Sequence, residues 1–89
     1  RTRSVIQIVR FAGANRLCVD LEYVDANGKR STQLIEPYSL RQSLEGNILL
    51  MAVRADNGEV RSYRVDGIYD VKVASQKFAA RYEVEISAG

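Results

Sequence analysis

Apolar and polar residues alternate along most of the chain, and this alternation predicts a mainly β domain. Every second residue from 17 to 23 is apolar, which is typical of a strand with one buried side. Asn27–Gly28 follows and, because both residues tolerate a positive φ, predicts a hairpin turn. The second strand is predicted to run from about residue 30 to 36 and to stop at Pro37, the only proline.

The remaining strands are expected between further turn signals. Residues 48–53 are continuously apolar, which predicts the central strand, buried on both faces. Asn57–Gly58 predicts a second hairpin, and alternating residues predict strands that reach Val73 and then a last strand over 82–86. Residues 74–80 are predicted to form the loop that joins these last two strands.

The first segment has a different spacing of apolar residues. Ser4 is a candidate helix cap, apolar residues follow at roughly helical spacing, and Gly13 is a natural stop, so we predict a short amphipathic helix over 4–13. The many β-branched residues in this segment leave a strand as the alternative. A helix followed by about five bent antiparallel strands favours a small barrel, and an open sheet with the helix on one face is the competing arrangement.

Length and composition place these elements in one small domain. The chain has 89 residues and begins at Arg1 rather than Met, so we expect a single domain cut from a longer multidomain protein. Cys18 is the only cysteine, which excludes a disulfide within the chain and fits the reducing cytoplasm. No signal peptide is visible and no apolar run is long enough to span a membrane.

The common catalytic and cofactor motifs are missing from the chain. It contains no His, which excludes a Ser-His-Asp triad and the usual zinc-binding spacings, and it contains no glycine-rich phosphate-binding loop. Cys18 has no His to activate it and is interpreted as a structural or surface thiol. We therefore expect no catalytic residues, no metal and no cofactor, and a binding module rather than an enzyme.

Arginine and tyrosine provide the remaining candidate chemistry. Ten of the thirteen basic residues are Arg, which suits bidentate contacts to phosphate, although the net charge is only +2. Arg61, Tyr63 and Arg64 follow the second hairpin turn, and Arg54 is expected to lie near them across that hairpin. Such a surface can bind phosphates while stacking bases. The alternative is that Tyr63 packs in the core and the arginines only solubilise the sheet.

Three segments carry a resemblance to a known family. They are Ile35-Glu36-Pro37-Tyr38-Ser39-Leu40, Gly46-Asn47-Ile48-Leu49-Leu50-Met51-Ala52-Val53 and Arg61-Ser62-Tyr63-Arg64-Val65-Asp66-Gly67-Ile68. As a set they resemble the WYL domain over roughly residues 5–86. The resemblance implies a five-stranded Sm-like (SH3-type) barrel with a short N-terminal helix. It also implies ligand sensing in bacterial proteins of transcription regulation, phage defence or DNA damage, with nucleotides or single-stranded DNA as favoured ligands.

The chain resembles a divergent member of this family. Arg64 matches a family arginine and Tyr63 its aromatic neighbour, whereas four other positions depart from the usual residues, namely Ile48, Leu49, Gln33 and Gly67. Arg30 stands near Gln33, and Tyr23 ends the first strand. The predicted ligand-binding residues are Arg64, Tyr63, Arg61, Arg54, Arg30 and Tyr23.

Two functions are therefore weighed. The first is a regulatory module that senses single-stranded DNA, an oligonucleotide or a nucleotide. The alternative is a protein-interaction or oligomerisation module without a small ligand, which acts as a homodimer or with a neighbouring domain through a sheet edge such as the predicted last strand. No membrane partner is expected.

Overall fold

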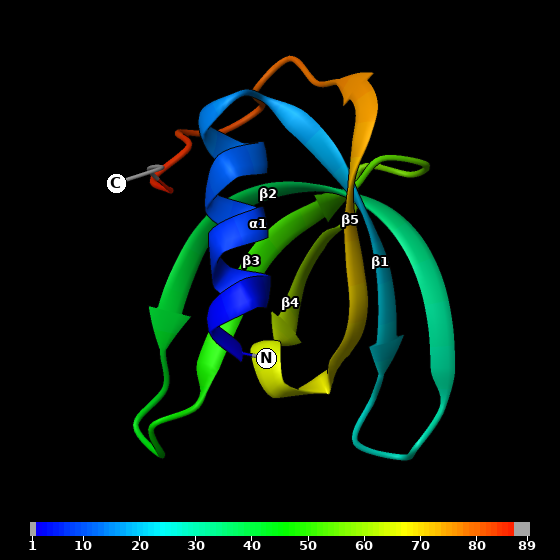
Figure 1. Ribbon diagram of the computed structural model, residues 1–89, viewed down its shortest axis with the longest axis vertical. Coiled ribbons are helices and arrows are strands. Elements are labelled where there is room, and N and C mark those ends of the chain that lie inside the picture. Colours follow the sequence, from blue (N-terminus) through cyan, green and yellow to red (C-terminus); the bar gives the residue numbers. More distant parts are fainter. Residues whose placement is uncertain (1, 87–89) are drawn as a thin grey trace.

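A computed structural model describes residues 2–86 (Figure 1). Its elements are helix α1 (Thr2–Ala14), strands β1 (Leu17–Val24), β2 (Arg30–Gln42), β3 (Ile48–Arg54) and β4 (Val60–Arg64), the 3₁₀ turn η1 (Val65–Gly67) and strand β5 (Ile68–Lys77). The strands form one antiparallel sheet in the order β4-β3-β2-β1-β5. The predicted fold class is confirmed. The curved sheet does not close, because β4 and β5 do not pair with each other, so the term barrel fits only loosely.

The N-terminal segment is a helix, and the strand alternative is wrong. Its buried side carries Val5, Val9 and Ala12, which recur at helical spacing and face the sheet. Gly13 does not stop the helix but lies within its last turn. A Cβ atom at this position would lie 3.2 Å from the Cβ of Ile86, so the missing side chain leaves room for that residue.

Both predicted hairpin turns are present. Gly28, between β1 and β2, has a φ of 80°, and Gly58, between β3 and β4, has a φ of 74°. The Asp25 carboxylate closes the first turn by accepting hydrogen bonds of 2.9 Å from the backbone N–H groups of Asn27 and Lys29. These turns are local features, which is why the dipeptides alone predicted them.

The second strand does not stop at Pro37, as predicted, but continues to Gln42. The β2–β3 register shifts between Pro37 and Ser39, which marks a bulge. A bulge tolerates a residue that cannot donate a ladder hydrogen bond, so the proline is accommodated inside the sheet. The long β2 is also the central strand, and the prediction that residues 48–53 are central is wrong: these residues form most of β3, between β2 and β4.

The C-terminal predictions are also corrected. The predicted loop over 74–80 is wrong in its first half, because β5 continues to Lys77, which pairs with Leu17. The predicted strand over 82–86 is absent, since these residues are irregular. We call residues 78–86 the C-terminal segment.

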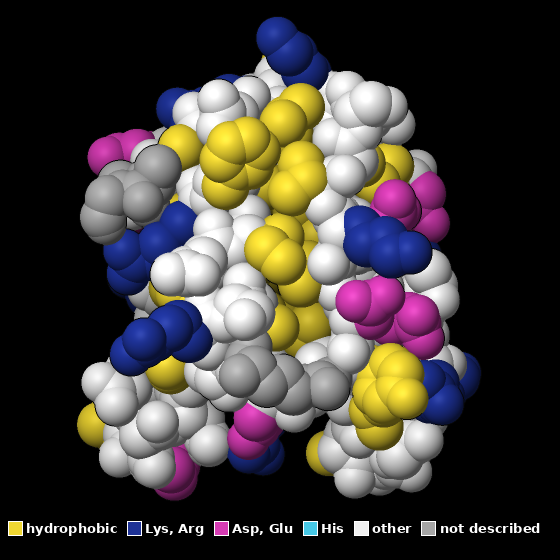
Figure 2. Space-filling model, viewed as in Figure 1, with side chains coloured by type: hydrophobic (Ala, Val, Ile, Leu, Met, Phe, Trp, Pro, Cys, Tyr) yellow, Lys and Arg dark blue, Asp and Glu magenta, His cyan; other side chains and the backbone are white. Residues whose placement is uncertain are grey.

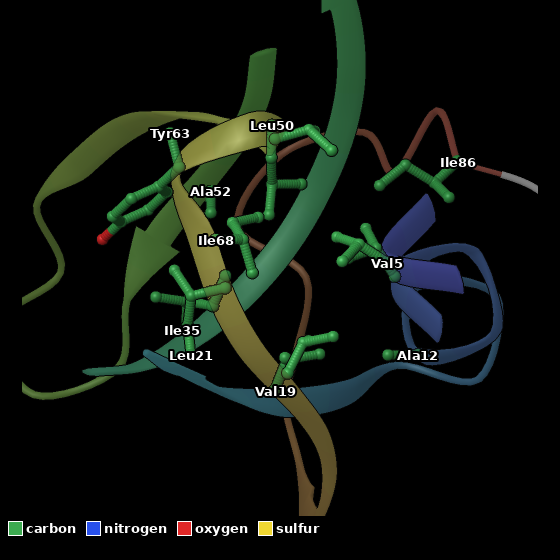
Figure 3. Packing of buried hydrophobic residues seen from close by; sticks show 13 residues of the cluster. Val5, Ala12, Val19, Leu21, Ile35, Leu50, Ala52, Tyr63, Ile68 and Ile86 are labelled. Carbon is green, nitrogen blue, oxygen red and sulfur yellow. The ribbon is translucent and has the colours of Figure 1, made fainter. Parts of the chain in front are cut away.

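The main core lies between the concave face of the sheet and α1. Figure 3 shows side chains from β1, β2, β3 and β5 converging on the helix, where Val5 and Ala12 face them. We call this the inner face. A second cluster lies on the outer face and consists of Cys18, Tyr38, Val53 and Phe78. Cys18 is fully buried there, and burial raises the pKa of its thiol, which agrees with a structural role.

Candidate ligand-binding site

Tyr63 defines the end of the inner face that lies away from α1. Tyr63 is only 3% exposed, its ring packs with the core, and its hydroxyl points away from the helix (Figure 3). The hydroxyl donates a hydrogen bond to Oε1 of Gln33, which belongs to the same face because it pairs with buried Leu21. The Tyr23 and Tyr63 rings pack edge-on, with 5.1 Å between the ring centres. The alternative that Tyr63 packs in the core is therefore correct for its ring, and only its hydroxyl is presented at this end.

Arg54 and Arg61 lie beside this hydroxyl. Arg54 pairs with Ile35 and Arg61 pairs with Ala52, so both arginines stand on the inner face in register with core residues. Burial raises the pKa of Tyr63, while the positive charges of the two arginines act in the opposite direction, as expected for neighbouring cations. We call this set the mouth: Tyr23, Gln33, Arg54, Arg61 and Tyr63.

Each mouth arginine is held by a carboxylate from the β3–β4 turn. The Arg54 guanidinium donates two hydrogen bonds to Asp56, of 3.1 and 2.7 Å, and Arg61 donates one to Glu59. These hydrogen bonds lower the pKa of both carboxyl groups. The mouth therefore carries two cations matched by two anions. An incoming phosphate therefore competes with Asp56 and Glu59 for the arginines, although each guanidinium keeps further N–H donors that these carboxylates do not use.

Arg64 lies next to the mouth but points away from it. Its backbone N–H donates to the Tyr23 hydroxyl at 3.0 Å, which links β4 to the end of β1. Its guanidinium instead binds Asp66 at 2.9 Å and Asn47 at 3.1 Å. The guanidinium thus lies near the β2–β3 turn, at the opposite end of β4 from Arg54.

Arg30 is not part of the mouth. It pairs with Val24 at the start of β2, and its side chain lies 3.5 Å from a Glu22 carboxylate oxygen. Its guanidinium carbon is 4.2 Å from the centre of the Tyr69 ring, a cation–π contact. The structure therefore brings together four of the six predicted residues, Tyr23, Arg54, Arg61 and Tyr63, and places Arg30 and Arg64 elsewhere.

Gln33 belongs to the mouth but was not among the predicted ligand-binding residues. The sequence identified it only as a departure from the WYL pattern, near the bulge-forming Pro37. Its place on the inner face follows the alternation of β2, in which Gln33 and Ile35 share a side. This alternation could have placed Gln33 on the inner face. It could not have predicted the hydrogen bond with Tyr63, because that residue lies on another strand.

The described part of the chain offers little other site chemistry. Within residues 2–86, no group of three or more His, Cys, Asp or Glu residues is placed to hold a metal ion. The same residues include no helix that is both long and apolar enough to cross a membrane.

Comparisons with known proteins agree with the fold. The family model described as WYL domain matches residues 4–73. Among solved structures, proteasome accessory factor B/C (PafBC) of Arthrobacter aurescens is similar, with a TM-score of 0.76 and 18% sequence identity. The match covers 84% of this chain and 12% of that one, and at this identity it shows the fold alone. No curated protein matches the sequence.

Proposed function

The chain belongs to the WYL domain family, and from this we propose that it is a regulatory module that senses nucleic acid or a nucleotide in the bacterial cytoplasm. The observation that carries the proposal is the mouth, where Arg54 and Arg61 share the inner face with Tyr63 and their positive charges act on its hydroxyl. Guanidinium groups bind phosphate in bidentate fashion. The Tyr63 hydroxyl already donates its proton to Gln33, so the two arginines are the donors to the phosphate.

The ligand in this proposal is recognised mainly through its phosphates. The Tyr63 ring is buried, so it offers no free face on which a base could stack. Single-stranded DNA or an oligonucleotide supplies adjacent phosphates for both arginines. Arg64, Arg30 and the exposed ring of Tyr69 lie outside the mouth and extend the basic and aromatic surface along which a strand can run.

The test is a titration of a fluorescein-labelled decathymidylate, followed by fluorescence anisotropy, at about 50 and about 200 mM salt. We expect the affinity to fall with rising salt, and the two mouth arginines should contribute about −1.4 to the slope of log K against log salt, because each neutralised phosphate of a single strand contributes about −0.7. Arg54→Ala and Arg61→Ala should each reduce the slope by about 0.7. Arg3→Ala, which removes the same charge from the exposed side of α1, should leave it unchanged.

Substitution of the carboxylates that pair with the mouth arginines should have the opposite effect on affinity. Asp56→Asn or Glu59→Gln frees one arginine, so the affinity should rise about two- to fivefold, the range expected for an exposed ion pair. Arg64→Ala tests the role that the family resemblance assigns to Arg64 in ligand binding. If that assignment is right, this variant should lose more affinity than any other single arginine variant. If the isolated chain fails to bind at low salt while a control oligonucleotide-binding barrel binds normally, the proposal is wrong.

A further inference from the structure

A groove on the outer face of the sheet lies apart from the mouth. Its floor is apolar and is formed by Met51 and Val53 of β3 and Val60 of β4, and its volume is about 500 Å³. Met51 and Val53 alternate with the core residues Leu50 and Ala52, so they face the opposite side of the sheet from Tyr63. We infer that this groove, which we call the outer groove, is a second binding site and that it takes a small aromatic molecule bearing an amine.

The far wall of the outer groove is built by the C-terminal segment, which is firmly attached. Arg81 donates hydrogen bonds of 3.1 and 3.3 Å to the two carboxylate oxygens of Glu36, whose side chain is only 6% exposed. The Arg81 N–H donates to the Tyr38 hydroxyl at 2.9 Å, and the Glu85 N–H donates to the Tyr38 carbonyl at 2.8 Å. The groove is therefore a preformed site rather than a gap beside a loose end.

The walls of the groove offer aromatic surface. The Tyr82 ring meets the buried Tyr38 ring edge-on at 5.7 Å and remains 56% exposed. Val60 on the floor is also 56% exposed. A flat apolar ligand can cover both residues at once, and the volume falls in the range of about 300–1,000 Å³ that is usual for small-molecule sites.

The charged residues at the rim of the groove favour a ligand with a positive charge. Arg41 is paired with Glu85 at 2.9 Å, which neutralises both. Glu83 also lines the groove but forms no ion pair with any residue from 2 to 86. The rim therefore carries one unmatched negative charge next to an exposed tyrosine ring, and both features attract a cation. An aromatic amine satisfies the apolar floor, the ring and the carboxylate together.

The experiment uses tryptamine as the probe and ¹⁵N-labelled chain. The amide shifts caused by tryptamine should centre on Met51, Val60 and Tyr82, with millimolar affinity because the ligand is small. Indole-3-propionate, which has the same ring but an anionic tail, should bind more weakly. The chain contains no Trp, so the indole fluorescence of the probe gives an independent measurement.

Variants locate the site. Glu83→Gln should weaken tryptamine binding about threefold, as expected for a solvent-exposed ion pair. Met51→Lys should abolish binding by placing a cation on the floor, while decathymidylate binding at the mouth is retained. Glu45→Gln, the same change in the exposed β2–β3 turn, is the matched control for Glu83→Gln. The proposal is overturned if tryptamine does not bind, if indole-3-propionate binds equally well, or if binding survives Met51→Lys in a folded variant.

Discussion

At the scale of single residues, Tyr63 shows how one side chain serves both the core and the site. Its ring belongs to the main core, whereas its hydroxyl donates a hydrogen bond to Gln33 and is subject to the positive charges of Arg54 and Arg61. The sequence could place Tyr63 near Arg54 and Arg61 because the hairpin turn fixed their relative positions. It could not decide whether the ring was buried, since residues on both sides of β4 alternate without a strong apolar pattern.

Three buried side chains, those of one cysteine and two tyrosines, make the stability of the fold sensitive to alkaline pH. Burial raises the pKa of Cys18, Tyr38 and Tyr63, so the folded protein keeps these protons at a pH where the unfolded chain has lost them. Their contribution is fully present below the unfolded pKa values of about 8.5 for Cys and about 10 for Tyr, and it is lost as pH rises through the folded values. We expect the free energy of unfolding to fall by about 1.4 kcal/mol per pH unit for each group in its window.

Urea unfolding between about pH 8 and about pH 11, which spans both unfolded pKa values, measures this effect. Tyr63→Phe should lower the stability near neutral pH by about 1 kcal/mol through the lost hydrogen bond, and it should also flatten the alkaline decline. Tyr82→Phe is the control, because Tyr82 is exposed. An identical decline in Tyr63→Phe and in the unaltered chain would contradict the assignment.

Gly67 gives a physical reason for one departure from the family pattern. A Cβ atom there would lie 2.8 Å from the Val24 carbonyl oxygen and 2.9 Å from Cε1 of Tyr23. A larger residue at this position would displace Tyr23, whose hydroxyl accepts the Arg64 N–H. The glycine and the position of Tyr23 are thus linked, which the sequence alone did not reveal.

At the scale of elements, the ion pair between Glu36 and Arg81 attaches the C-terminal segment to β2. Glu36→Ala should lower the free energy of unfolding by about 2 kcal/mol, because hydrogen bonds to a charged, buried carboxylate are lost. Amide exchange at Glu85 should become faster as the segment loosens. Urea unfolding and hydrogen exchange provide the two measurements, with Glu45→Ala as the control. Unchanged exchange at Glu85 would mean that the segment is held by other contacts.

The helix and the hairpins were predictable because their signals are local. The ends of the strands were not, because they depend on distant partners. Lys77 continues β5 because Leu17 of β1 lies opposite, and no pattern within 74–80 announces this pairing. Residues 82–86 alternate like a strand because Val84 and Ile86 pack on the core. Among residues 2–86, however, they have no ladder partner, and the Glu85 N–H donates its hydrogen bond to the Tyr38 carbonyl.

At the scale of the whole molecule, the open sheet leaves two unpaired edges among the described residues. The β4 edge has five residues and carries Arg61 and Arg64, which discourage pairing with another chain. The β5 edge has ten residues and also carries the basic residues Lys72 and Lys77, but it is twice as long, and Val73 on it is 36% exposed. Figure 2 shows apolar side chains in a strip beside α1, so this face also offers apolar surface. These features support the interaction module as the second candidate function.

We expect weak, concentration-dependent dimers that form through the β5 edge. Sedimentation velocity over a range of concentrations should show an increasing mean mass, and Val73→Lys should abolish the increase. Leu44→Lys is the matched control, because Leu44 is a fully exposed apolar residue in the β2–β3 turn. A strict monomer at the highest concentration would count against self-assembly.

The contact between Gly13 and Ile86 connects the outer groove to the helix, so ligand binding in the groove can affect how the helix docks on the sheet. The segment that presents Tyr82 and Glu83 to the groove ends with Ile86 packed against the last turn of α1. A ligand that holds this segment in place favours the same arrangement that docks the helix, so binding and helix docking are thermodynamically linked. Reciprocally, a substitution at Gly13 that displaces Ile86 would weaken binding in a groove that it never touches.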